Sequence, residues 1–276
     1  MRYCRFRDGY GTLYGAVEER EGEPWIVDLV DAPEEDLAFR LEHGRSRALG
    51  LGFEPLRLKD AELLVPVTPS KIVCVGRNYR DHAKELGNEV PAEPLLFFKP
   101  PSSLLAPGGV VRIPRVTERV DFEGELALVI GKRASKVHFG VHPGEDWRSY
   151  VRGYVLANDV TARDLQKKDG QWTRAKGFDT FGPVGPWVSD EIEPHEGVII
   201  ETRVNGEVRQ HGSTGDFIFT IPELLAYITA AITLEPGDLV LTGTPAGVGP
   251  LKGGDTVEVS IPGLGVLTNT FAPETA

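Results

Sequence analysis

The hydrophobic residues of this chain fall mostly into short runs separated by turn-forming residues, a pattern typical of β-strands. Such runs predict strands at residues 71–76, 95–98, 126–130, 153–158, 238–244, 255–261 and 265–271. The 32 glycines and 21 prolines of the chain exceed the usual share of these residues and match the many turns that short strands require. The pattern therefore indicates a mainly β protein.

A hairpin and three helices complete the predicted elements. The Asn-Gly pair at residues 205–206 follows a run at 198–204 and favours a tight hairpin, because both positions must take positive φ. Residues 221–232 carry a proline near their start and apolar residues on most faces, which predicts a buried helix. Residues 79–86 predict a short helix, and another is expected to begin at Thr161.

The chain divides into two parts at a proline-containing connector. Pro66 and Pro69 favour an extended segment between a short leading region and the rest. The leading region, residues 1–66, contains short apolar runs and a polar stretch with helical spacing around residues 34–41. The sequence thus predicts a small N-terminal domain and a larger α+β, mainly β domain at residues 67–276.

The charge of the chain restricts its partners. With 30 basic and 41 acidic residues among 276, the formal net charge is −11, so the mean electrostatic field of the protein repels nucleic acids and anionic membrane surfaces.

The two cysteines, Cys4 and Cys74, are too few for a disulfide framework or a cysteine-based zinc site. No signal-peptide pattern and no run of ~18 apolar residues occurs. We expect a cytoplasmic protein in which an acidic ligand requires local positive charge.

Two glutamates at the start of a predicted strand are the first candidates for chemistry. Glu123 and Glu125 are two residues apart, so they point to the same side of the strand, and apolar residues follow them. Two neighbouring anions beside a buried strand are costly unless a cation lies between them. Their hard oxygen ligands favour Mg²⁺, Mn²⁺ or Ca²⁺ over zinc. The alternative is an edge strand whose glutamates are solvated.

A third carboxylate follows a neighbouring apolar run. Asp159 ends the strand predicted at residues 153–158, a position where functional residues commonly gather. The alternative is that Asp159 caps the helix expected to begin at Thr161.

A histidine and a glutamate in the predicted helix at residues 79–86 form the second candidate group. His82 and Glu85 are three residues apart, on one face of a helical turn, and can share a hydrogen bond. A carboxylate partner orients an imidazole and raises its pKa, which suits water activation near neutral pH. The alternative is an ordinary surface pair.

The chain resembles the fumarylacetoacetate hydrolase family over roughly three quarters of its length. The resemblance is carried by VGRNY at residues 75–79, HAKE at 82–85, FKP at 98–100, EGEL at 123–126, DVTARD at 159–164, AKGF at 175–178 and LTGTP at 241–245. It implies the mixed β-sandwich roll of that family, preceded by a small N-terminal domain, and a homodimer.

The resemblance also implies roles for site residues. Glu123, Glu125 and Asp159 are expected to hold one Mg²⁺ or Mn²⁺ ion, and His82 with Glu85 to form a catalytic dyad on a lid helix. Lys176 is expected to contact the carboxylate or the developing oxyanion of the substrate. Further substrate-binding residues implied by the resemblance are Arg77, Gln166 and Thr244.

The activity implied is cleavage of a C–C bond in a 2-oxo, β-dicarbonyl acid by an acylpyruvate hydrolase or oxaloacetate decarboxylase. Glu85 would orient His82 for deprotonation of a water, and the metal would stabilise an enolate. The alternative is a 2-hydroxyhepta-2,4-diene-1,7-dioate isomerase of aromatic catabolism, in which the same base moves a proton between carbons. A third interpretation is a non-catalytic module that binds a metal and an organic acid, which would have no use for the dyad.

Overall fold

The computed structural model describes the whole chain except residues 10, 33–51, 86, 88, 140–145 and 276. Its strands are β1 (Arg2–Asp8), β2 (Gly11–Arg20), β3 (Glu23–Val30), β4 (Leu56–Arg57), β5 (Glu62–Leu64), β6 (Ile72–Gly76), β7 (Leu95–Lys99), β8 (Leu104–Leu105), β9 (Val110–Ile113), β10 (Val120–Phe122), β11 (Gly124–Ile130), β12 (Val151–Asn158), β13 (Thr161–Ala162), β14 (Gly182–Ser189), β15 (Ile199–Val204), β16 (Glu207–Ser213), β17 (Leu239–Leu241), β18 (Gly249–Leu251), β19 (Thr256–Ile261) and β20 (Gly265–Pro273). Its α-helices are α2 (Arg80–Glu85), α3 (Arg163–Asp169), α4 (Thr173–Gly177) and α5 (Ile221–Ala231). Short 3-10 helices are η1 (Leu58–Asp60), η2 (Pro101–Ser103), η3 (Trp147–Tyr150), η4 (Pro194–Glu196) and η5 (Thr214–Asp216).

Three sheets organise these strands. The largest has the order β4-β3-β2-β1-β14-β12-β11-β17-β6-β7, with β5 paired to β1 and β8 paired to β14. A five-stranded sheet has the order β16-β15-β19-β20-β9, and a three-stranded sheet the order β13-β10-β18. Most pairs are antiparallel, but β6 with β17, β8 with β14 and β9 with β20 are parallel. The predicted mainly β, α+β fold is confirmed.

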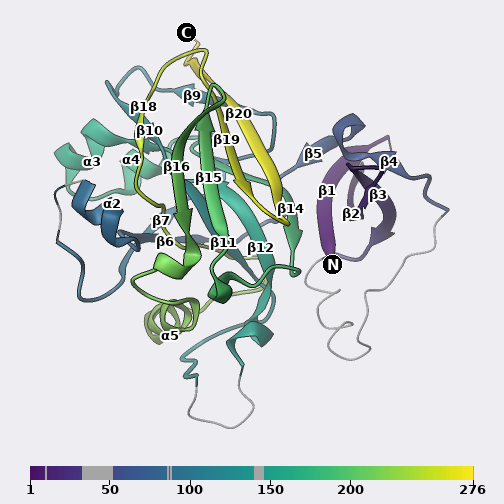
Figure 1. The fold of residues 1–276 in the computed structure, drawn as a ribbon, viewed down its shortest axis with the longest axis horizontal. Helices are drawn as coiled ribbons and strands as arrows, with labels where there is room; N and C mark the ends of the chain where they lie inside the picture. The colour runs from purple at the N-terminus through teal and green to yellow at the C-terminus, as the bar shows by residue number, and fades with distance from the viewer. Residues whose placement is uncertain (10, 33–51, 86, 88, 140–145, 276) are drawn as a thin grey trace.

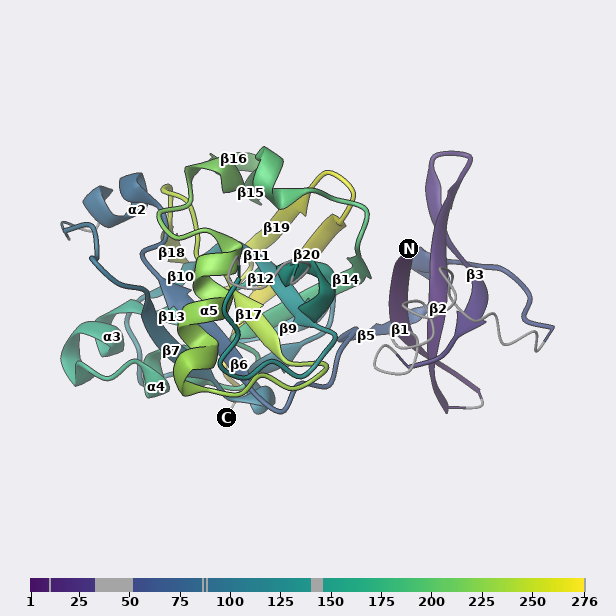
Figure 2. The ribbon, with the colours of Figure 1, turned by 90° about the horizontal axis from the view of Figure 1, so that it is seen from below.

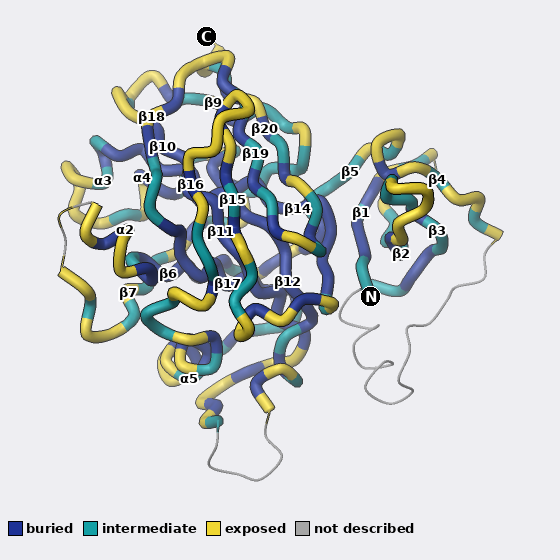
Figure 3. Tube along the Cα trace, in the orientation of Figure 1, coloured by how far each residue is buried: buried dark blue, intermediate teal, exposed yellow. Residues whose placement is uncertain are grey.

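Strand β11 lies at the centre of the main body and is buried along its whole length. Leu126, Leu128 and Ile130 pack into the apolar cluster that also contains residues of the five-stranded sheet and α5. Ala127 and Val129 pack into a second cluster on the opposite face of the large sheet. The two-residue period of the strand therefore supplies two cores at once, and Figure 3 shows the resulting buried centre.

Helix α5 forms where the apolar pattern predicts a buried helix. Its start is stabilised by a capping box, in which the Thr220 main-chain N–H donates to the Glu223 carboxylate at 2.7 Å, and Pro222 occupies the first turn. Leu224 and Ile228 are completely buried. None of the helices in the described part of the chain has the length and apolar character needed to span a bilayer.

The N-terminal strands form a smaller group beside the main body (Figures 1 and 2). Their core includes Cys4, Phe6 and Ile26, and it extends to Trp187 of β14. β1 pairs with β14, with Tyr3 opposite Val188, so the large sheet runs through both parts. The domain boundary at residue 66 stays a prediction.

The hairpin expected at residues 205–206 is present between β15 and β16. Asn205 has φ 52° and Gly206 has φ 82°, which is the left-handed backbone that a two-residue turn of this kind requires. The helix predicted around residues 34–41 lies outside the described residues.

Two predicted boundaries are wrong. The helix expected from Thr161 begins at Arg163, because Thr161 and Ala162 pair with β10. The strand expected over residues 238–244 ends at Leu241, because Gly243 takes a φ of 100°, which lies outside the extended region of a strand.

Candidate active site

A pocket with a volume of about 510 Å³ is lined in part by residues of α2, α3 and α4. It is lined by all the residues that the sequence indicated for chemistry or binding: Arg77, His82, Glu85, Glu123, Glu125, Asp159, Gln166, Lys176 and Thr244. These residues come from segments up to about 170 positions apart in the chain, so the fold assembles a single site from them.

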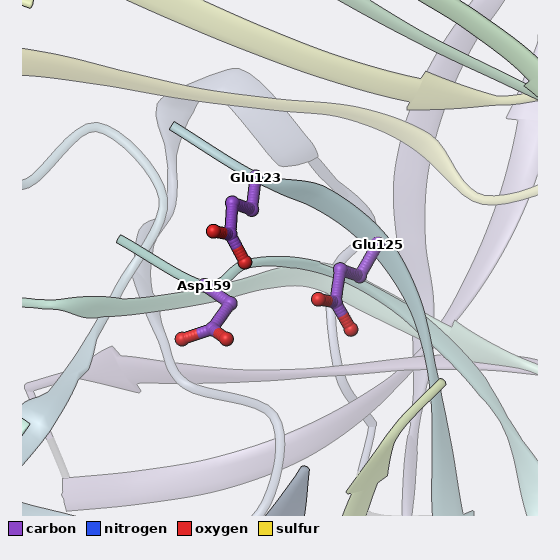
Figure 4. A group of neighbouring side chains, drawn as sticks. All are labelled: Glu123, Glu125 and Asp159. Atoms are coloured by element: carbon purple, nitrogen blue, oxygen red, sulfur yellow. The ribbon is translucent and has the colours of Figure 1, made fainter. Parts of the chain in front are cut away.

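Three buried carboxylates, Glu123, Glu125 and Asp159, meet on one side of two neighbouring antiparallel strands; we call them the acidic triad. Gly124 of β11 pairs with Asn158 of β12, and the main-chain N–H of Asp159 donates to the carbonyl of Glu123 at 2.8 Å. Glu125 lies two residues farther along, hence on the same side. One carboxylate oxygen from each residue lies within 4.8 Å of the others, and the three groups face a common space (Figure 4).

Three buried cations surround the triad. Lys176 Nζ donates to Glu123 Oε2 at 2.8 Å and to Asp159 Oδ2 at 2.5 Å. Arg163 Nη2 donates to Glu123 Oε1 at 2.5 Å, and Lys99 Nζ donates to Asp159 Oδ1 at 2.7 Å. The local positive charge expected in this acidic protein is therefore supplied from inside the fold.

The glutamates of the triad differ in their electrostatic environment. Burial alone would raise the pKa of Glu123, but the charges of Lys176 and Arg163 outweigh it and lower that pKa below its ordinary value. Burial raises the pKa of Glu125 well above its ordinary value, and the charges of Asp159 and Glu123 raise it further. Glu125 is thus the carboxylate with the greatest need of a cation.

The triad fits a hard divalent cation. The Glu125 carboxylate accepts the main-chain N–H of Gly243 at 2.8 Å, and within the described ranges no lysine or arginine forms an ion pair with it. An all-oxygen, buried ligand set of this kind suits Mg²⁺ or Mn²⁺ better than zinc.

The two structural alternatives for the triad are excluded. Glu123 and Glu125 are only 5% and 2% exposed, and β11 is an internal strand, so they are not solvated edge glutamates. The N-cap of α3 is Ala162, whereas the Asp159 side chain bonds to two lysines; Asp159 therefore does not cap that helix.

His82 and Glu85 share the face of α2 that borders the pocket. His82 Nδ1 lies 3.4 Å from Glu85 Oε2, and both Glu85 oxygens accept the N–H of Gly247 at 3.1 Å. His82 is 4% exposed, and burial lowers its pKa below the ordinary value of 6.5, although Glu123 and Glu85 oppose this shift. The imidazole is accordingly neutral at neutral pH and is held through Glu85 by a distant loop.

The three residues expected to bind substrate all line the pocket. Gln166 Oε1 accepts Arg163 Nη1 at 2.8 Å, which turns the amide oxygen toward the protein. The Thr244 hydroxyl donates to the Gly124 carbonyl at 2.8 Å and accepts from Gln210 Nε2 at 2.7 Å. Arg77 has no hydrogen-bond or ion-pair partner among the residues that the structure describes.

Sequence reasoning assigned no role to several residues that build this site. Lys99 and Arg163 bond directly to the triad, although both stand in motifs that carry the family resemblance. Gln210 bridges Thr244 and the main-chain N–H of Gly124. The signal in the sequence that could have indicated Lys99 as a site residue is its position directly after the apolar run at residues 95–98, where a charged side chain follows a predicted strand.

Comparison with known proteins gives a consistent result. The profile described as "Fumarylacetoacetate (FAA) hydrolase C-terminal" matches residues 71–272. Oxaloacetate tautomerase YisK of Bacillus subtilis is 42% identical in an alignment of 233 positions, which covers 79% of this chain and 76% of that protein. Mitochondrial oxaloacetate decarboxylase of Dictyostelium discoideum is 45% identical in an alignment of 203 positions, which covers 71% of this chain and 91% of that protein.

A solved structure extends the similarity over the whole chain. The crystal structure of 2-hydroxyhepta-2,4-diene-1,7-dioate isomerase from Mycobacterium marinum is 38% identical, with a TM-score of 0.85, and the match covers 100% of both chains. The N-terminal strands are thus part of the shared architecture.

Proposed function

Because this chain belongs to the fumarylacetoacetate hydrolase family, we propose that it is a divalent-metal-dependent enzyme that moves a proton on a small 2-oxo dicarboxylic acid, interconverting its keto and enol forms. The observation that carries this proposal is the buried His82, paired with Glu85 and bordering the same pocket as the acidic triad. Relatives named for acting on oxaloacetate support the substrate class.

The triad would hold one Mg²⁺ or Mn²⁺ ion. Such a cation would polarise the 2-oxo group and stabilise the negative charge that develops on its oxygen. Arg163 and Lys99 orient the carboxylates of Glu123 and Asp159 by direct hydrogen bonds. Lys176 presents its ammonium group at the pocket wall, where it would interact with anionic oxygens of the substrate.

His82 would accept the proton from the carbon next to the 2-oxo group and would then donate it to the enolate oxygen, which gives the enol. Glu85 positions the imidazole through Nδ1, so Nε2 is the nitrogen left for the substrate. The N–H of Gly247 fixes Glu85 from the opposite side. A base that is shielded from bulk water suits the transfer of a proton between a carbon of the substrate and a nitrogen of the imidazole, because this step needs no water molecule.

Arg77 is expected to bind the second carboxylate of the substrate. It lines the pocket together with Lys167, and neither has an ion-pair partner within the described part of the chain. Replacing Arg77 by methionine is expected to raise KM for oxaloacetate about tenfold, since a hydrogen bond to a charged group contributes roughly 1.5–3 kcal/mol. Steady-state kinetics measures this, with Arg80→Met, at an exposed position outside the pocket, as the matched control. An unchanged KM in Arg77→Met contradicts the assignment.

The pH profile of kcat/KM tests the state of His82. Because burial lowers the pKa of His82 below 6.5, the neutral, proton-accepting form persists in more acidic solution than for an ordinary histidine. The acidic limb of the profile is therefore expected below pH 6.5. The hydrogen bond that His82 donates to the Glu85 carboxylate, together with the charge of that carboxylate, raises the pKa of His82, so Glu85→Gln is expected to move the limb to still lower pH. A limb above 6.5 in the unmodified enzyme argues against His82 as the base.

Cleavage of a C–C bond, the reaction that the sequence placed first, is the second candidate. It is favoured by the pocket volume of about 510 Å³, which leaves room beyond a four-carbon acid for an acyl group and a water. Decarboxylation of oxaloacetate and hydrolysis of an acylpyruvate pass through the same type of enolate, so the same residues would serve both reactions.

A mass-resolved product screen distinguishes these candidates. The purified chain is incubated with Mg²⁺ or Mn²⁺ and with oxaloacetate, acylpyruvates or 2-hydroxy-dienedioates. Tautomerisation changes the ultraviolet absorbance of the enol and conserves mass, whereas cleavage yields two smaller products. The expected result is enol–keto exchange of oxaloacetate that stops on chelation by EDTA. Inactivity on the whole panel would contradict the proposed function and favour a non-catalytic binding module.

A further inference from the structure

Two buried lysines each donate a hydrogen bond to a different oxygen of the Asp159 carboxylate. Lys99 Nζ donates to Oδ1 at 2.7 Å, and Lys176 Nζ donates to Oδ2 at 2.5 Å. Lys99 and Lys176 are only 1% and 2% exposed. Despite this symmetry at the aspartate, their remaining contacts differ.

Lys99 is bound mainly to the main chain. Besides Asp159, its ammonium group donates to the main-chain carbonyl of Val160 at 3.2 Å and to that of Lys176 at 2.5 Å. These three acceptors match the three donors of a lysine. Lys99 therefore ties the end of β12 to helix α4, and its bonds do not depend on the other carboxylates of the triad.

Among the residues that the structure describes, the Lys176 ammonium donates its hydrogen bonds to the triad only. The acceptors of its ammonium group are Glu123 Oε2 and Asp159 Oδ2, and the ring of Phe97 lies 4.9 Å from Nζ. Both acceptors belong to the residues expected to hold the metal. A divalent cation and the Lys176 ammonium consequently compete for the same two carboxylates.

We infer that the two lysines have separate tasks: Lys99 holds Asp159 permanently, whereas Lys176 is the protein's own counter-ion that a divalent cation displaces from Glu123 and Asp159. This inference rests on the proposed function, since it requires a metal at the acidic triad. Its consequence is that metal loading releases the Lys176 ammonium toward the pocket, so metal binding prepares the cation that receives the anionic substrate.

Matched variants separate the two tasks. Lys176→Met keeps the length of the side chain and removes the competing charge, so Mn²⁺ is expected to bind at least about tenfold more tightly than to the unmodified chain. Lys99→Met removes the support of Asp159, and Mn²⁺ is expected to bind about tenfold more weakly, as is typical when a group that orients a ligand is lost. Isothermal titration calorimetry of the full-length chain with Mn²⁺ alone measures both affinities.

Thermal unfolding supplies a readout that does not depend on activity. In EDTA, Lys176→Met is expected to unfold at a lower temperature than the unmodified chain, because Glu123 and Asp159 lose their shared counter-ion. Saturating Mn²⁺ is expected to raise its unfolding temperature by more than that of the unmodified chain. An affinity for Mn²⁺ that is unchanged or weaker in Lys176→Met, or equally tightened in both variants, overturns the inference.

A measurement on the unmodified chain covers the case in which a variant does not fold. Lysine side chains labelled with ¹⁵N are observed while Mg²⁺ is added, and the Nζ signal of Lys176 is expected to move while that of Lys99 stays. Equal movement of the two signals, or of neither when Mg²⁺ binds, overturns the inference alone. If the unmodified chain binds neither Mn²⁺ nor Mg²⁺, the inference and the metal dependence of the proposed function fail together.

Discussion

Replacing His82 by alanine is expected to lower kcat on oxaloacetate by about 10²- to 10⁴-fold, the usual contribution of a positioned general base. The affinity for Mn²⁺ is expected to stay near that of the unmodified enzyme, because the hydrogen bond of the imidazole is to Glu85 and not to the acidic triad. Turnover under substrate saturation and Mn²⁺ calorimetry measure the two quantities on the same preparation.

A second histidine offers a matched control for this variant. His211 lies on β16, where 60% of its side chain is exposed and its ring faces Glu201 at 3.5 Å, and it does not line the pocket. His211→Ala is expected to keep full turnover. If His82→Ala also retained its turnover while remaining folded, the dyad would have no part in the mechanism.

Glu125→Gln is expected to abolish Mn²⁺ binding and turnover while leaving the metal-free protein at least as stable as the unmodified chain. The carboxylate is 2% exposed and receives one N–H bond, from Gly243. A glutamine carbonyl accepts that bond equally well and removes a buried charge that is costly without a cation. The loss of Mn²⁺ affinity is expected to exceed the roughly 10- to 100-fold typical of residues that only orient a ligand.

Calorimetry and thermal unfolding in EDTA measure the two effects of Glu125→Gln separately. Glu85→Gln is the matched control within the pocket, because it makes the same chemical change outside the triad; it is expected to lower turnover without abolishing it and to keep its Mn²⁺ affinity. Tight Mn²⁺ binding by Glu125→Gln would exclude Glu125 from the metal ligands, and a marked fall in metal-free stability would show that its charge is stabilising.

The elements that the sequence predicted correctly are those set by local backbone geometry. The two-residue period of β11 sends Leu126 and Ala127 into different cores, and Asn205-Gly206 forms its turn because of the φ values it permits. The same period placed Glu123 and Glu125 on one side of the chain. Such features depend on neighbouring residues alone, and the sequence contains those neighbours.

The composition of the site depended on which strands pair. Asp159 meets Glu123 because β12 lies antiparallel to β11 in one particular register, and Gly247 holds Glu85 from 162 residues away. The sequence could propose these residues as separate candidates, but the alternatives for them, a helix cap and a solvated edge strand, were excluded only by the burial and the contacts of the folded chain.

By itself, then, the sequence determined several of the strands, the buried helix, the likeness to a family and the residue types of the site, whereas β14 at the centre of the large sheet was not predicted. Only the tertiary structure decided how charge is balanced in the site. Lys99, Lys176 and Arg163 reach the acidic triad from three different segments. The physical reason is that the energy of a buried charge depends on the charges within a few ångström of it, and those neighbours are set by the packing of segments that no local pattern connects.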